Sequence, residues 1–88
     1  MADIRLPPTL PPLVPGLPRR LELSAATVGE LLDALEERWP GLRDRLCEPG
    51  PMLRRHIHIF VDGQHAELHS PIGPTSRVDV ITAISGGE

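Results

Sequence analysis

The chain has 88 residues, enough for a single domain with one modest hydrophobic core and too few for a second. Its formal net charge is −3 and its nine basic residues are all arginine, spread without a dense cluster, which argues against nucleic acid as a partner. The first residues lack the basic and apolar regions of a signal peptide, and no apolar run is long enough to cross a bilayer, so we expect a cytoplasmic protein without a membrane partner.

Two short segments near the start, residues 3–6 and 20–24, alternate polar and apolar side chains, and each pattern predicts a half-buried strand. Between them, residues 7–18 contain six prolines. Proline lacks a backbone N–H and opposes both helix and central strand, so this stretch is expected to form a loop or wide turn. A polyproline ligand for an aromatic groove is the alternative, but a connector inside so small a domain is favoured.

The next segment carries the clearest helix signal. Thr27 and Glu30 form a capping-box pattern, and five apolar residues then follow at helical spacing: Val28, Leu31, Leu32, Leu35 and Trp39. Residues 40–41, Pro-Gly, end this helix, and residues 42–46 are predicted to add a short helical turn before the Pro-Gly-Pro break at 49–51. The only cysteine, Cys47, has no partner for a disulfide or dithiol motif and is interpreted as a small apolar core residue.

Residues 55–61 alternate again and predict a strand with one covered face. One face carries Ile57, Ile59 and Val61, and the other carries His56, His58 and Phe60. The dipeptide at 62–63, Asp-Gly, predicts a tight hairpin turn with residues 64–68 running back. Residues 78–82 predict the last strand, and residues 83–88 are expected to be a flexible tail.

These elements predict an α+β domain that spans residues 1–88, with a mixed sheet of about four or five strands and one main helix packed across one face. This arrangement is the economical way to bury the apolar stripes of the helix and the strands together.

The order of these elements, with a Gly-Gly pair near the end, resembles the β-grasp (ubiquitin-like) sulfur carriers of the ThiS/MoaD family, in particular the cysteine-forming carriers. The segments that carry the resemblance are residues 10–16, 27–32, 39–42, 53–63 and 80–87. The chain departs from the family pattern at three places. An acidic turn is replaced by residues 73–76, a proline of the final strand is replaced by Thr82, and Glu88 follows the glycine pair.

The resemblance implies a function that depends on the tail. In the family, a partner adenylyltransferase similar to ubiquitin-activating enzymes uses MgATP to adenylate the terminal glycine carboxylate, and sulfur then displaces AMP to give a thiocarboxylate. Gly87 would be the acyl residue, and Gly86 would let the extended tail pass through a narrow channel. A partner synthase would accept the sulfur. The chain itself would be neither an enzyme nor the holder of a cofactor, and the metabolite that receives the sulfur is left open.

Glu88 affects this chemistry directly, because while it is attached the carbonyl of Gly87 is part of an amide. Either a peptidase such as a zinc-dependent JAMM protease removes Glu88, or the residue is not part of the natural chain. Two other functions stay open: a modifier conjugated through Gly87 to protein amines, and a β-grasp interaction module with an inert tail.

The side chains of His56, His58 and Phe60 are candidates for a partner surface, although Phe60 is equally compatible with half-buried packing. His65 could approach the two histidines across the hairpin, but nothing in the sequence supplies a secure third ligand. Solvent-facing or partner-facing histidines are therefore favoured over a metal site.

Overall fold

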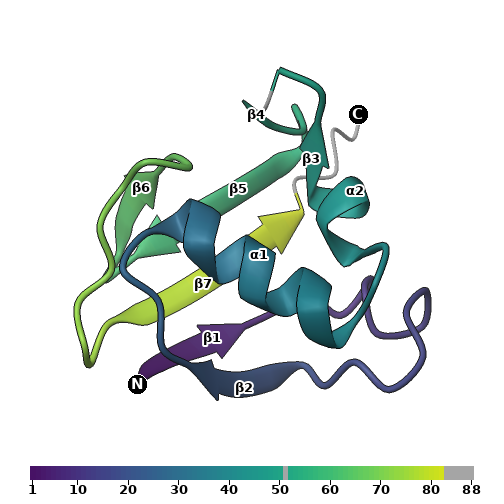
Figure 1. Ribbon diagram of the computed structural model, residues 1–88, viewed down its shortest axis with the longest axis horizontal. Coiled ribbons are helices and arrows are strands. Elements are labelled where there is room, and N and C mark those ends of the chain that lie inside the picture. Colours follow the sequence, from purple (N-terminus) through teal and green to yellow (C-terminus); the bar gives the residue numbers. More distant parts are fainter. Residues whose placement is uncertain (51, 83–88) are drawn as a thin grey trace.

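A computed structural model of the chain describes residues 1–50 and 52–82. It contains a five-stranded mixed sheet in the order β2-β1-β7-β5-β6 (Figure 1). The strands are β1 (Ala2–Arg5), β2 (Arg20–Leu23), β5 (Ile57–Val61), β6 (Gln64–Ala66) and β7 (Arg77–Thr82). β7 is central: it runs parallel to β1 and antiparallel to β5. The predicted β-grasp fold is thus confirmed.

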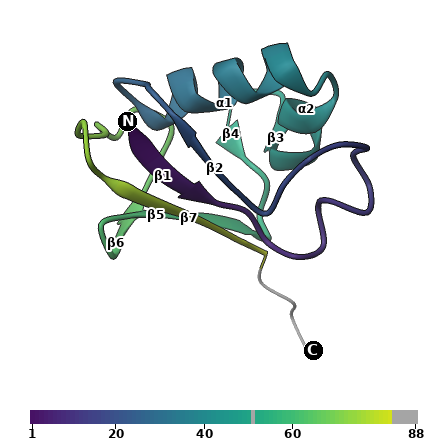
Figure 2. The same ribbon diagram turned by 90° about the horizontal axis from the view of Figure 1, so that it is seen from below.

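The main helix, α1 (Val28–Arg38), lies across one face of the sheet (Figure 1). Its first turn is closed as predicted, because the Thr27 hydroxyl accepts a 3.2 Å hydrogen bond from the backbone N–H of Glu30. Figure 2 shows α1 and the short helix α2 (Leu42–Leu46) on the same side of the sheet, whereas the described chain places no helix on the other side. One face of the sheet is therefore open.

The core forms between α1 and the sheet, and it is aliphatic. Burying a leucine or isoleucine side chain stabilises a fold by about 1.5–3 kcal/mol, so the apolar stripe of α1 contributes much of the stability of so small a domain. The largest fully buried side chains come from both layers: Ile4, Val28, Leu31, Leu32, Leu35, Leu42, Leu46, Ile59 and Val78.

The connection between α1 and α2 depends on Glu36. Its carboxylate accepts hydrogen bonds from the backbone N–H groups of Gly41, at 2.9 Å, and Arg43, at 2.8 Å. These two bonds lower the pKa of Glu36. They also satisfy N–H groups at the start of α2, whose N-cap Gly41 has no side chain to do so.

The proline-rich connector between β1 and β2 forms hydrogen-bonded turns, for example from the N–H of Leu13 to the carbonyl of Leu10. The predicted connector is thus confirmed, but it contributes more than a loop. Leu10, Val14 and Leu17 are at most 6% exposed and belong to the core. The prolines favour turns that return the chain to the core at intervals.

The sequence prediction missed a second, two-stranded sheet formed by β3 (Cys47–Glu48) and β4 (Met52–Leu53). Proline cannot donate a ladder hydrogen bond, but the prolines here lie between the paired residues. Cys47 is buried in the core, as predicted. Among the helices of the described residues, none is long and apolar enough to cross a membrane.

Candidate functional site

The residues expected to carry the chemistry, Gly86, Gly87 and Glu88, lie outside the described residues. The structure does describe the end of the strand that leads to them. Thr82 is the last residue of β7 and pairs with Ile57 of β5. Its hydroxyl lies 3.4 Å from that of Thr9 in the β1–β2 connector. The candidate site therefore begins at the end of the central strand.

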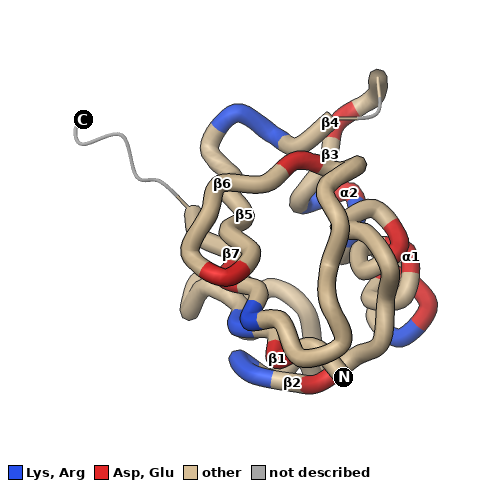
Figure 3. Tube along the Cα trace, turned by 90° about the vertical axis from the view of Figure 1, so that its left-hand side faces the viewer, with Lys and Arg blue, Asp and Glu red and all other residues tan. Residues whose placement is uncertain are grey.

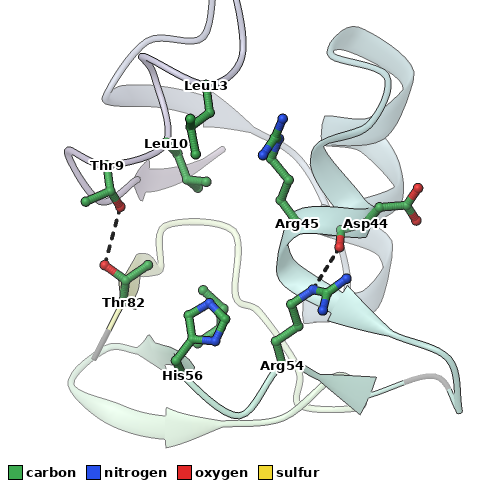
Figure 4. A pocket seen from close by; sticks show the side chains of 9 residues that line it. Thr9, Leu10, Leu13, Asp44, Arg45, Arg54, His56 and Thr82 are labelled. Carbon is green, nitrogen blue, oxygen red and sulfur yellow. Dashed lines mark hydrogen bonds between the residues drawn. The ribbon is translucent and has the colours of Figure 1, made fainter. Parts of the chain in front are cut away.

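A cavity of about 470 Å³ lies at this end of β7, and we call it the tail-root pocket (Figure 4). The connector, α2 and the segment before β5 bring its walls together. Its lining residues are Thr9, Leu10, Leu13, Asp44, Arg45, Arg54, His56, Ile57 and Thr82.

The basic side chains of the tail-root pocket are Arg45 and Arg54, and the connector faces Arg45 with the apolar side chains of Leu10 and Leu13 (Figure 4). The Nε–H of Arg54 donates a 2.9 Å hydrogen bond to the backbone carbonyl of Asp44, which fixes its guanidinium at the pocket wall. The side chain of Asp44 points away from this contact. Figure 3 shows a basic stretch between β4 and β5, which is residues 54–55, and charges of both signs on other parts of the chain.

His56 is placed differently from the prediction. It precedes β5 instead of lying within it, is exposed, and lines the tail-root pocket. His58 and Phe60 do lie on β5, with half-buried side chains between the buried residues Ile57 and Ile59. The predicted row of three side chains is thus a pair, because strand alternation begins only at Ile57.

The open face of the sheet carries this pair next to residues of β6 and β7. His65 of β6 and Asp79 of β7 are the direct cross-strand partners of Phe60 on its two sides, and Ile81 is the partner of His58. Direct partners share a face of the sheet, so these five side chains form one surface, which we call the open-face patch. Ile81 is 45% exposed, so the patch includes solvent-exposed apolar surface.

Sequence reasoning omitted His65 and Ile81 from the candidate surface. A signal for each was present. A two-residue turn at Asp62 and Gly63 fixes the register in which Phe60 faces His65. The alternation of β7 that buries Val78 and Val80 requires Ile81 to face the opposite way.

The described residues contain no group of three or more His, Cys, Asp or Glu side chains that could hold a metal ion. Cys47 is also separate from the open face. Burial raises the pKa of its thiol, against the smaller opposite effect of Arg43 and Arg54, so the neutral form is favoured.

The sequence profile of the ThiS family matches residues 13–87 of the chain. The chain belongs to the ThiS family. The match begins within the connector, after β1, and runs through β2, both helices and β3 to β7 to the glycine pair. No match was found among curated proteins.

Solved structures agree with this ThiS-family assignment at the level of the fold. CysO from Amycolatopsis orientalis, in a complex with BexX, gives a TM-score of 0.87 at 24% identity over 99% of this chain and 100% of that one. CysO from Mycobacterium tuberculosis gives 0.84 at 24% identity over 96% and 100%. SAMP1 from Haloferax volcanii gives 0.76 at 27% identity, with 98% of each chain covered.

Proposed function

We propose that this protein is a sulfur carrier whose Gly87 carboxylate is adenylated and converted to a thiocarboxylate. The observation that carries the proposal is the family match, which runs through the glycine pair and ends at Gly87. Fold alone does not define function, but a ThiS-family fold whose central strand precedes a Gly-Gly pair in the sequence supports a chemical role for that pair.

Two displacement steps account for the chemistry. A carboxylate oxygen of Gly87 attacks the α-phosphorus of ATP, forms an acyl-phosphate bond and releases pyrophosphate. Hydrosulfide then attacks the acyl carbon, AMP leaves, and a thiocarboxylate remains. Activation is necessary because a free carboxylate repels nucleophiles and would have to expel oxide. The ATP, its Mg²⁺ and the groups that catalyse both steps belong to the partner adenylyltransferase.

The partner enzymes of this proposal must bind a surface of the domain while the tail enters their active site. The open-face patch fits this role, because it combines half-buried Phe60 and exposed Ile81 with polar side chains at their border. CysO of A. orientalis, which shares the fold, forms a complex with BexX. By analogy, we infer that an adenylyltransferase and a sulfur-accepting synthase bind this chain in turn.

Glu88 must be absent before activation, because the terminal carboxylate of the 88-residue form belongs to glutamate. We propose that a protease of the JAMM type removes it. The test compares pyrophosphate exchange by forms that end at Gly86, Gly87 and Glu88, each with MgATP and the adenylyltransferase of the same genome. Only the form that ends at Gly87 should exchange, and mass spectrometry confirms that each terminus stays intact.

The form that ends at Gly86 is the matched control, because it also presents a terminal glycine carboxylate but is one residue shorter. Exchange by the intact 88-residue form at the rate of the Gly87 form would show that Gly87 is not the activated residue, and would remove the basis of the proposal. With sulfide added, the Gly87 form should gain about 16 Da as oxygen is replaced by sulfur.

A second candidate is protein modification, favoured by the likeness to SAMP1, a small archaeal modifier protein. The same activated Gly87 would then pass to a lysine amine of a target. The chain contains no lysine and so could not form lysine-linked chains on itself. Covalent adducts on other proteins would support modification. A chain that neither gains mass nor forms adducts would be an interaction module.

A further inference from the structure

Two histidines meet on the open face, across the hairpin of β5 and β6. Because Phe60 pairs directly with His65, His58 is the diagonal neighbour of His65 on the same face. The Nδ1 atom of His58 lies 3.4 Å from the Nε2 atom of His65, and the ring centroids are 5.6 Å apart. The two rings thus direct nitrogen atoms at each other.

We infer that His58 and His65 form a two-imidazole site for a divalent transition metal ion such as Zn²⁺. Two Zn–N bonds of about 2.0–2.1 Å at a tetrahedral angle place their nitrogens roughly 3.3–3.4 Å apart. The observed separation of 3.4 Å already meets this requirement. The half-buried ring of His58 and the exposed ring of His65 must turn so that both lone pairs converge on one point. Imidazole is a preferred ligand for zinc and copper.

The surroundings fix the spacing of the two residues before any ion binds. His65 contacts Phe60 edge-on, with ring centroids 5.4 Å apart and planes at 83°. The backbones of β5 and β6 are joined by the ladder on either side of this contact. A ligand pair that is already ordered loses less conformational freedom on binding, so the apparent affinity rises.

The site is a partial one. Glu67 and His69 line the same groove as the pair, with Glu67 Oε1 3.9 Å from His69 Nδ1. The described residues nevertheless bring no third ligand together with His58 and His65. The remaining positions are therefore open to water or to an oxygen ligand of a docked molecule. The sequence allowed His65 to approach both His56 and His58 across the hairpin, and the cross-strand register brings it to His58.

Titration calorimetry of the tag-free, full-length chain with ZnCl₂ tests the site. We expect one ion per chain, and His58→Gln or His65→Gln should each weaken binding by at least about tenfold, because the two ligands act as one chelate. His56→Gln and His69→Gln are matched controls, since every variant keeps three of the four histidines. Both controls should bind as tightly as the wild type.

Nitrogen-15 spectra of the imidazoles provide a second readout, in which Zn²⁺ should shift His58 and His65 but leave His56 and His69 in place. Backbone amide spectra of each variant check that the fold is retained. Absence of binding by the folded wild type, or an equal loss in all four variants, would overturn the inference. Neither result bears on adenylation of Gly87, so this test and that of the proposed function succeed or fail separately.

Discussion

The carboxylate of Asp62 accepts a 2.8 Å hydrogen bond from the hydroxyl of Ser76, which joins the turn after β5 to the residue that precedes β7. Its other oxygen accepts a 2.9 Å bond from the backbone N–H of Arg77. Asp62 holds these bonds with a positive φ of 52°, and Gly63 follows with a φ of 85°. The predicted hairpin turn is thus confirmed, and it also anchors the start of the central strand.

This anchor predicts how stability depends on pH. The bonds from Arg77 N–H and then from the Ser76 hydroxyl lower the pKa of Asp62 in the folded state. The ionised carboxylate therefore makes its full contribution to folding stability above the ordinary pKa of about 3.9. This contribution is lost as the pH falls through the lower pKa of the folded state. Between about pH 5 and pH 2, the free energy of unfolding measured with urea should fall more for the wild type than for Asp62→Asn.

Asp3 and Glu36, whose pKa values are also lowered, remain in the Asp62→Asn variant, so the difference between the two curves isolates Asp62. Glu37→Gln, which changes an exposed carboxylate on α1, is the control. If Asp62→Asn and the wild type lose the same stability as the pH falls, the charge of the Asp62 carboxylate does not stabilise the fold.

Leu35→Ala should lower the free energy of unfolding by about 2–4 kcal/mol, because the side chain is fully buried in the middle of α1 and its removal leaves a cavity. Urea denaturation measures the change. Glu37→Ala, on the exposed side of the same helix, should stay within about 0.5 kcal/mol of the wild type. An unchanged midpoint for Leu35→Ala would show that this face of α1 is not packed on the sheet.

Phe60→Ala should weaken binding to the adenylyltransferase or the synthase more than it weakens folding, because Phe60 is half-buried on the face away from α1. Binding by calorimetry and stability by urea denaturation are measured on the same samples. Met52→Ala, which truncates an apolar residue 55% exposed on β4, controls for general loss of apolar surface. A stability loss above about 3 kcal/mol with unchanged binding would assign Phe60 to the core instead.

Cys47→Ser should still accept sulfur at Gly87, because the Cys47 thiol is buried and its pKa is raised by that burial. The measurement is the mass gain of the Gly87 form with its activating enzyme, MgATP and sulfide. Serine places a hydroxyl in an apolar site, so Cys47→Ala is made in parallel to separate a folding defect from a chemical one. Failure of both folded variants to form thiocarboxylate would give the thiol a role in the transfer.

The local parts of the fold were readable from the sequence because their signals are local. The Thr27 cap and the Asp62-Gly63 turn each depend on residues within one turn of chain. The pairing of Cys47 with Leu53 was missed because it closes around prolines, which indicate only a break. The burial of Leu10 was missed for a related reason: its neighbours in the core come from distant segments.

The candidate site, too, could be predicted only in part from the sequence. The sequence and its resemblance to a family indicate the glycine pair as the site, which lies outside the described residues and stays a prediction. His56 was assigned to the wrong surface, because alternation gives no sign of where the strand actually begins. The contact of His58 with His65 requires the register of two strands, which becomes certain only with the folded chain.

The position of β7 also determines how the domain responds to mechanical load. In the proposed function, an enzyme that draws in the C-terminal end would pull along β7, whose hydrogen bonds to β1 and β5 run across the direction of the pull. Because β1 is parallel to β7, traction on the two chain ends loads their shared ladder in shear, with its bonds strained together instead of being opened one after another. We therefore expect the domain to stay folded while a partner enzyme pulls on its C-terminal end.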